Sequence, residues 1–203
     1  MSDGCVTPKR AVQLRAEVKE KYRAVSRDPL GHFKYPVGRD SLVRLGYALE
    51  WLTSVPREIA ERFVGVGNPF SIRHPRQGDR VLDLGCGCGF DTFVAASLVG
   101  PEGQAVGLDL SPEMLEYPRA ALARTRTRQL QFKEGSVESL PFEDASFDVV
   151  ISNGALNLVP DKHVAFREIA RVLRPDGDFV TADLIVMQTI PEEIAASMDA
   201  WST

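Results

Sequence analysis

The sequence predicts an α/β fold: a doubly wound, mostly parallel sheet with helices on both faces and an N-terminal helical cap. Three observations support this prediction. Short strand-like stretches alternate with helical ones from about residue 80 onward. The stretch 147–152 is apolar at its centre, as are strands that are buried on both faces. A glycine-rich turn at residues 85–89 follows the first strand directly and leads into a helix.

The composition indicates one globular core. The chain has 203 residues, of which 44% are hydrophobic, and its net charge is −4. This charge gives no reason to expect nucleic acid or an anionic membrane as a partner. The sequence shows neither an apolar run of the roughly 20 residues that span a bilayer nor a signal-peptide core, so we expect a cytoplasmic protein.

The first 76 residues form the predicted helical cap. Apolar residues at helical spacing predict an amphipathic helix over 9–26, and a loop rich in glycine and proline follows it to residue 40. Two short helices are expected over 42–52 and 56–63. Residues 77–203 then form the predicted sheet domain.

The sheet domain contains five expected strands and three expected helices. Ser111 is expected to cap the second helix, and Pro118 should kink that helix or separate its first turns. The third helix ends before Pro175. The expected strands are 81–84, 104–109, 129–134, 147–152 and 179–184, and the expected helices are 90–99, 111–124 and 164–173.

The glycine turn predicts a ligand site. Its glycines can adopt positive φ and bring bare backbone close to a ligand, beside the amino end of the following helix. A dinucleotide fingerprint would place its third glycine at position 90, where this chain has Phe90. A nucleoside without a pyrophosphate suits the pattern better, with Asp109 on the ribose hydroxyls. Since the carboxyl ends of parallel strands share one edge, we expect a single site there, at Asp83, Asp109, Ser136 and Asn153.

From Arg80 to Asp183 these landmarks resemble class I S-adenosylmethionine-dependent methyltransferases. The resemblance implies S-adenosyl-L-methionine as cofactor, with the ribose on Asp109 and the adenine beside Ser136 and Val137. Asn153 would face the amino-acid end of the cofactor or the methyl acceptor. The cofactor-binding residues that we expect are Asp83, Gly85, Cys86, Gly87, Gly89, Asp109, Leu110, Met114, Ser136, Val137, Glu138 and Asn153.

Within this family, the chain resembles the arsenite methyltransferase branch at 45–47, 54–56, 67–69, 99–103, 151–153, 157–162 and 190–194. That branch uses one thiolate in the loop within the N-terminal cap and one just after the fourth strand. Here the loop 28–40 has no cysteine and Gly154 occupies the second place, so we do not expect arsenite as substrate, because soft metalloids need sulfur ligands. Methyltransferases that act on amino groups of DNA or RNA carry an Asn/Asp-Pro-Pro-aromatic motif after the fourth strand. This chain has Gly154-Ala155-Leu156 there, so we do not expect nucleic acid as a substrate.

The resemblance implies transfer of a methyl group to a small molecule by direct displacement, and it identifies no catalytic residue. Two alternatives remain open: a protein that binds the nucleoside without turnover, and a nicotinamide-dependent oxidoreductase, which Phe90 disfavours. No metal is expected, because Cys86 and Cys88 lack further ligands nearby. Family members continue past the tryptophan that corresponds to Trp201 and add two strands. The fifth strand is therefore expected to be an edge, through which two copies could dimerise.

Overall fold

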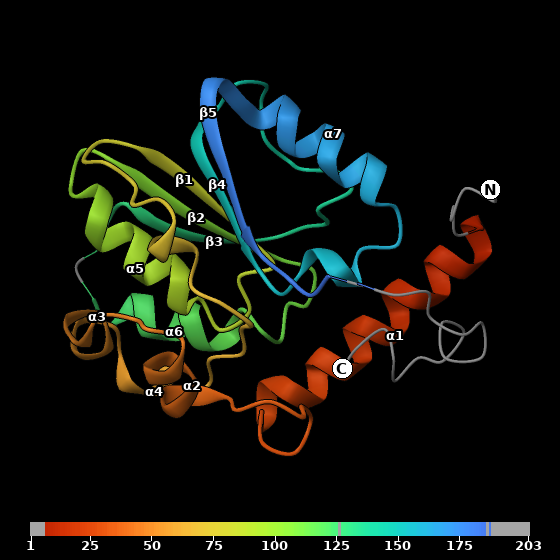
Figure 1. The fold of residues 1–203 in the computed structure, drawn as a ribbon, viewed down its shortest axis with the longest axis horizontal. Helices are drawn as coiled ribbons and strands as arrows, with labels where there is room; N and C mark the ends of the chain where they lie inside the picture. The colour runs from red at the N-terminus through yellow and green to blue at the C-terminus, as the bar shows by residue number, and fades with distance from the viewer. Residues whose placement is uncertain (1–6, 126, 186, 188–203) are drawn as a thin grey trace.

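The computed structural model describes residues 7–125, 127–185 and 187. Its centre is a five-stranded parallel sheet in the order β3-β2-β1-β4-β5 (Figure 1). The strands are β1 (Arg80–Leu84), β2 (Gln104–Asp109), β3 (Leu130–Glu134), β4 (Phe147–Asn153) and β5 (Leu173–Ala182). The predicted doubly wound parallel sheet is confirmed. Strand order reverses between β1 and β4, which places a ligand crevice beyond their carboxyl ends.

Helices cover both faces of the sheet. Helices α5 (Phe90–Val99) and α6 (Glu116–Ala123) lie on one face and α7 (Lys162–Val172) lies on the other (Figure 1). Because successive strand residues point to opposite faces, Val81 packs into the core under α5 and Leu82 into the core under α7. The central strands are therefore apolar on both sides, as the sequence predicted.

Three elements differ from the prediction. The expected helix over 42–52 is two helices, α2 (Gly38–Arg44) and α3 (Leu49–Ser54), because Gly46 adopts a φ of 75° between them. Helix α6 begins at Glu116 rather than residue 111, which places Pro118 in its first turn, where a missing N–H is tolerated. Ser111 therefore does not cap it. Strand β5 begins at Leu173 rather than residue 179, and its ladder is interrupted: Leu173 pairs with Phe147 and Asp178 with Val149.

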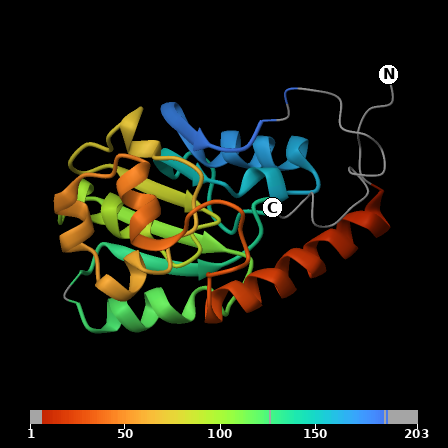
Figure 2. The same ribbon diagram turned by 60° about the horizontal axis from the view of Figure 1, so that its bottom comes forward.

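The cap has two parts. Helix α1 (Pro8–Arg27) extends along one side of the molecule, apart from α2–α4 (Figure 2). The remainder consists of α2, α3, α4 (Arg57–Ala60) and the 3-10 helix η1 (Pro69–Ser71), and its aromatic side chains share one core cluster with α5 and the sheet. The domain boundary expected at residue 76 stays a prediction.

Two further expectations concern the end of the chain. Among the described residues no strand pairs with the outer side of β5. The stretch 190–194 and Trp201, on which part of the resemblance rested, lie outside the described residues. Within the described part of the chain, no helix combines the length and apolar character that a membrane crossing requires.

Candidate functional site

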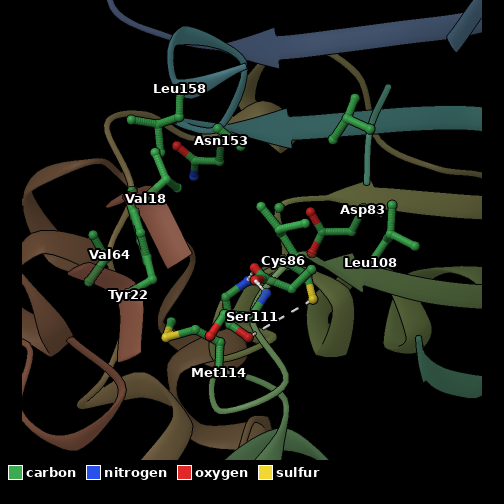
Figure 3. A pocket seen from close by; sticks show the side chains of 18 of the residues that line it. Val18, Tyr22, Val64, Asp83, Cys86, Leu108, Ser111, Met114, Asn153 and Leu158 are labelled. Carbon is green, nitrogen blue, oxygen red and sulfur yellow. Dashed lines mark hydrogen bonds between the residues drawn. The ribbon is translucent and has the colours of Figure 1, made fainter. Parts of the chain in front are cut away.

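A cavity lies beyond the carboxyl ends of β1, β2 and β4, between the sheet and α1. Its empty space, including the open mouth, is about 1120 Å³. Val18 and Tyr22 of α1 lie opposite the strand ends that carry Asp83 and Asn153 (Figure 3). Of the expected cofactor-binding residues, all but one line this cavity: Asp83, Gly85, Cys86, Gly87, Asp109, Leu110, Met114, Ser136, Val137, Glu138 and Asn153. The exception is Gly89, which begins α5 and lies against Phe132.

The turn between β1 and α5 presents its backbone to the cavity. Gly85 and Gly87 have φ values of 66° and 53°, which residues with a side chain rarely adopt. A Cβ at Gly85 would lie 2.3 Å from the Cβ of Ala155, so a side chain would not fit without displacing that loop. The turn is therefore a place where a ligand can approach the main chain closely.

Asp109 ends β2 and faces the glycine turn. Its Oδ2 accepts a hydrogen bond from the N–H of Gly87 at 2.8 Å, and its Oδ1 accepts one from the N–H of Ser111 at 2.8 Å. A carboxylate has about four lone-pair positions, so each oxygen can accept a further bond from a ligand hydroxyl. Burial raises the pKa of Asp109 to about 6, although these amide bonds oppose the shift.

Two more buried carboxyl groups lie beside the turn. The Oδ2 of Asp83 accepts a hydrogen bond from the hydroxyl of Thr92 at 2.6 Å. Burial raises the pKa of Asp83, and the nearby charges of Asp91 and Asp109 raise it further. Burial also raises the pKa of Asp91. Among the described residues, none of these three carboxyl groups forms a salt bridge, so this end of the cavity is strongly negative when they are ionised.

Asn153, at the end of β4, ties the cap to the sheet. Its Nδ2 lies within hydrogen-bonding distance of Asp91 Oδ2 (3.0 Å) and of the Gly67 carbonyl (2.8 Å), and its Oδ1 accepts the N–H groups of Val66 and Gly67. The hydroxyl of Tyr47 lies 2.7 Å from Asp91 Oδ1. The amide of Asn153 is therefore engaged within the protein, although the residue lines the cavity.

Glu138 lines the cavity where helix α1 covers it. Arg15 donates to it twice, from Nε to Oε2 at 2.6 Å and from Nη2 to Oε1 at 2.8 Å. The same Oε1 accepts the N–H of Asp161 at 3.1 Å. Glu138 thus joins α1 to the loops after β3 and β4, and the ion pair holds the helix over the cavity.

The two cysteines of the glycine turn are buried. The thiol of Cys88 donates to the carbonyl of Ile59 at 3.4 Å, and burial raises its pKa to about 12. Burial also raises the pKa of Cys86. Among residues 7–125, 127–185 and 187, no three His, Cys, Asp or Glu side chains gather as a metal site would require.

Sequence reasoning missed several residues of the cavity wall: Arg15, Tyr22, Tyr35, Arg62 and Asp91. Four of them belong to the cap, and no local pattern in the sequence indicates which cap residues line the cavity. A usable signal existed only for Asp91, an acidic residue in the first turn of the helix that follows the glycine turn.

Comparisons with known proteins agree with this geometry. A family model described as a methyltransferase domain matches residues 75–203. Arsenite methyltransferase from Halobacterium salinarum is 38% identical over 157 residues, which cover 77% of this chain and 40% of that protein. Demethylmenaquinone methyltransferase from Lactococcus lactis is 42% identical over 109 residues, covering 52% of this chain and 43% of that protein.

A solved structure is similar as well. The crystal structure of an arsenic(III) S-adenosylmethionine methyltransferase from Chlamydomonas reinhardtii matches with a TM-score of 0.66 and 40% identity, covering 72% of this chain and 51% of that one. The chain spans about two fifths of the length of the two curated relatives, 40% and 43%. Since the family model covers more than half of the sequence, the chain belongs to the methyltransferase domain family, among the class I S-adenosylmethionine-dependent methyltransferases of the arsenite methyltransferase-like branch.

Proposed function

We propose that this chain binds S-adenosyl-L-methionine in the cavity and directs its methyl group to a small-molecule acceptor. The observation that carries the proposal is the meeting of the glycine turn and Asp109 across adjacent strand ends, 2.8 Å apart from N–H to carboxylate. Such a pair suits an adenosyl group, because the bare turn admits the ligand and the carboxylate accepts bonds from ribose hydroxyls.

The charge of the cavity also favours this cofactor. S-adenosylmethionine carries an ammonium and a sulfonium against one carboxylate, so its net charge is positive. Asp83, Asp91 and Asp109 would attract such a ligand and would repel the pyrophosphate of a dinucleotide. The nicotinamide alternative is therefore disfavoured by electrostatics as well as by Phe90.

The bound cofactor would supply a methyl group on a good leaving group, so the protein's part is orientation and exclusion of water. The helix α1 and the loop after it contribute Val18, Tyr22 and Tyr35 to the wall, and the 3-10 helix η2 (Leu156–Leu158) contributes Leu158. These largely apolar side chains favour an apolar or aromatic acceptor. We do not propose arsenite, because the buried thiols of the glycine turn, with raised pKa values, are poor sources of thiolate.

The first test is binding. Wild-type protein should bind S-adenosylhomocysteine in calorimetry, and Asp109→Ala should weaken this binding about 10-fold or more, because two hydrogen bonds to a charged group are lost. The exposed Asp144 provides a control, since Asp144→Ala should leave the affinity unchanged. Unchanged affinity in Asp109→Ala would refute the assigned role.

The second test separates an enzyme from a protein that only binds the cofactor. Labelled S-adenosylmethionine is incubated with the chain and a panel of quinols, thiols, amines and arsenite, and transferred label is counted. Label on one acceptor class supports methyl transfer. Binding without transfer, in this chain and in a longer form if one exists, would favour the binding-only alternative.

Two further proposals are independent of the cofactor. Two copies are proposed to associate through the outer edge of β5, since unpaired strand edges readily pair. Light scattering should then show a mass that rises with concentration, and a constant monomer mass would contradict this. The cytoplasmic location is likewise proposed, and fractionation of cells that produce the tagged protein tests it.

A further inference from the structure

We propose that Arg62 binds the α-carboxylate of the cofactor's methionine moiety, an inference that rests on the proposed function. The cofactor presents one carboxylate to a cavity wall that already holds three carboxyl groups. That group therefore needs a cation or free amides close by, and the wall offers few cations.

The cationic side chains of the described wall are Arg15, Lys19 and Arg62. Arg15 is held by Glu138 in a two-point ion pair. Lys19 Nζ lies 3.7 Å from Glu134 Oε1. Within the described part of the chain Arg62 has no carboxylate partner, and its Nε is buried without any hydrogen bond. Arg62 is thus the wall cation that remains available to an anionic ligand.

The surroundings of Arg62 hold its guanidinium in place. The Cζ atom lies 4.0 Å from the centre of the Tyr117 ring, a distance that indicates stacking. A stacked guanidinium keeps the N–H groups of its edge free for a planar, two-point contact with a carboxylate. The aromatic ring thus fixes the group without using its hydrogen-bonding capacity.

The chain segments around Arg62 and its stacking partner contact the glycine turn. Arg62 follows α4, and the carbonyl of Ile59 in α4 accepts the thiol of Cys88 in the turn. Met114, three residues before Tyr117, reaches the same turn: its Cε lies 3.3 Å from the position of a Cβ on Gly87. Arg62 and the turn thus line the same cavity, and the segments that carry Arg62 and Tyr117 both contact the turn over which we propose that the cofactor lies.

The test compares ligands that differ at one end. S-adenosylhomocysteine carries the amino acid, decarboxylated S-adenosylhomocysteine lacks only the carboxylate, and 5′-methylthioadenosine lacks the whole amino-acid end. In Arg62→Gln, the affinity for S-adenosylhomocysteine should fall about 10- to 100-fold, as expected for a charge-assisted pair. The affinities for the other two ligands should change less than about twofold.

Two variants serve as controls. Arg80 also lies over an aromatic ring, that of Phe147, but does not line the cavity, so Arg80→Gln should bind all three ligands like the wild type. Arg62→Lys keeps the charge and should lose less affinity than Arg62→Gln. If Arg62→Gln does not fold, the same ligand series on Arg62→Lys and on the wild type decides the question.

The outcomes are distinct. Equal losses for all three ligands would mean that Arg62 supports the cavity wall and would overturn the inference, as would an unchanged affinity for S-adenosylhomocysteine. Wild-type protein that binds S-adenosylhomocysteine no better than 5′-methylthioadenosine would overturn it too, with the proposed function intact. Wild-type protein that binds neither would defeat the proposed function itself.

Discussion

The two parts of the cap differ in how much charge contributes to their attachment. Residues 38–71, which we call the fused part, bury Tyr47, Trp51 and Phe70 in the same core cluster as Phe90 of α5. The rings of Tyr47 and Phe90 meet edge to face at 5.4 Å. Burial of apolar and aromatic surface is the dominant stabilising force in folding, and salt does not screen it as it screens charge pairs.

Helix α1 buries Leu14 and Val25, and it adds a row of ion pairs at the cavity rim. Arg15, Lys19 and Arg23, spaced four residues apart, pair with Glu138, Glu134 and Glu113. The three acids belong to segments at the ends of β2 and β3, which we expect to hold the adenosyl group. The comparison indicates that the attachment of the fused part does not respond to salt, whereas the ion pairs that α1 forms with the rim can be weakened by it.

The largest expected effect tests the fused part. Phe70 is fully buried, so Phe70→Ala should lower the free energy of unfolding by about 3–5 kcal/mol through lost burial and the cavity left behind. Leu49 in α3 is 73% exposed, and Leu49→Ala should change stability by less than about 0.5 kcal/mol. Urea unfolding of both variants measures this. A loss below about 1 kcal/mol for Phe70→Ala would show that this part is not fused to the core.

The second prediction concerns the polar tie between the fused part and the sheet. Asn153→Ala leaves Asp91 and the N–H groups of Val66 and Gly67 without their partner. Because unpaired buried polar groups are costly, we expect a loss of about 2–4 kcal/mol in urea unfolding. Tyr47→Phe removes a single hydroxyl and should cost less. If Asn153→Ala is as stable as the wild type but binds the cofactor more weakly, the side chain instead contacts the ligand.

The sequence predicted those parts of the site that depend on residues close together in the chain. The glycine turn and Asp109 follow from residue order and from the rule for the ends of parallel strands. The tie among Tyr47, Asp91 and Asn153 joins residues 44, 62 and 106 positions apart, and no local pattern encodes such pairs. Ser111 shows a local signal that failed. Its hydroxyl donates to Glu113, and its N–H binds Asp109, because the helix starts later at Glu116.

The third prediction concerns the pH dependence of stability, which we expect to arise from the buried acids rather than from those that hold α1. Burial raises the pKa of Asp109 to about 6, and it raises the pKa values of Asp83 and of Asp91, which is hydrogen-bonded to Tyr47 of the fused part. Between the unfolded and the folded pKa, the folded protein binds more protons, so its free energy of unfolding should rise as the pH falls from 7 to 5. The slope is at most about 1.4 kcal/mol per pH unit for each proton.

Cofactor binding should change in the opposite direction over the same range. Protonated Asp109 offers fewer acceptors to the ribose, so the affinity for S-adenosylhomocysteine should be constant above pH 7 and fall below about pH 6. Glu113, which pairs with Arg23 of α1, does not follow this pattern: hydrogen bonds from its own backbone N–H and from the Ser111 hydroxyl lower its pKa. Calorimetry at pH 5, 6 and 7 checks the affinity, and Asp109→Asn should flatten the profile. If the free energy of unfolding and the affinity both fall as the pH is lowered, the role assigned to Asp109 is wrong.

The smallest effect is expected at α1. Its ion pairs are partly exposed, so 0.5 M NaCl should weaken them by screening while the core is unaffected. We expect the dissociation rate of S-adenosylhomocysteine to rise about two- to fivefold in stopped flow, with little change in melting temperature. Arg15→Gln removes the best-formed pair, and in this variant the rate should already be raised at low salt and respond less to added salt. A salt response as large in Arg15→Gln as in the wild type would mean that α1 does not control release, and that both parts of the cap form a fixed wall.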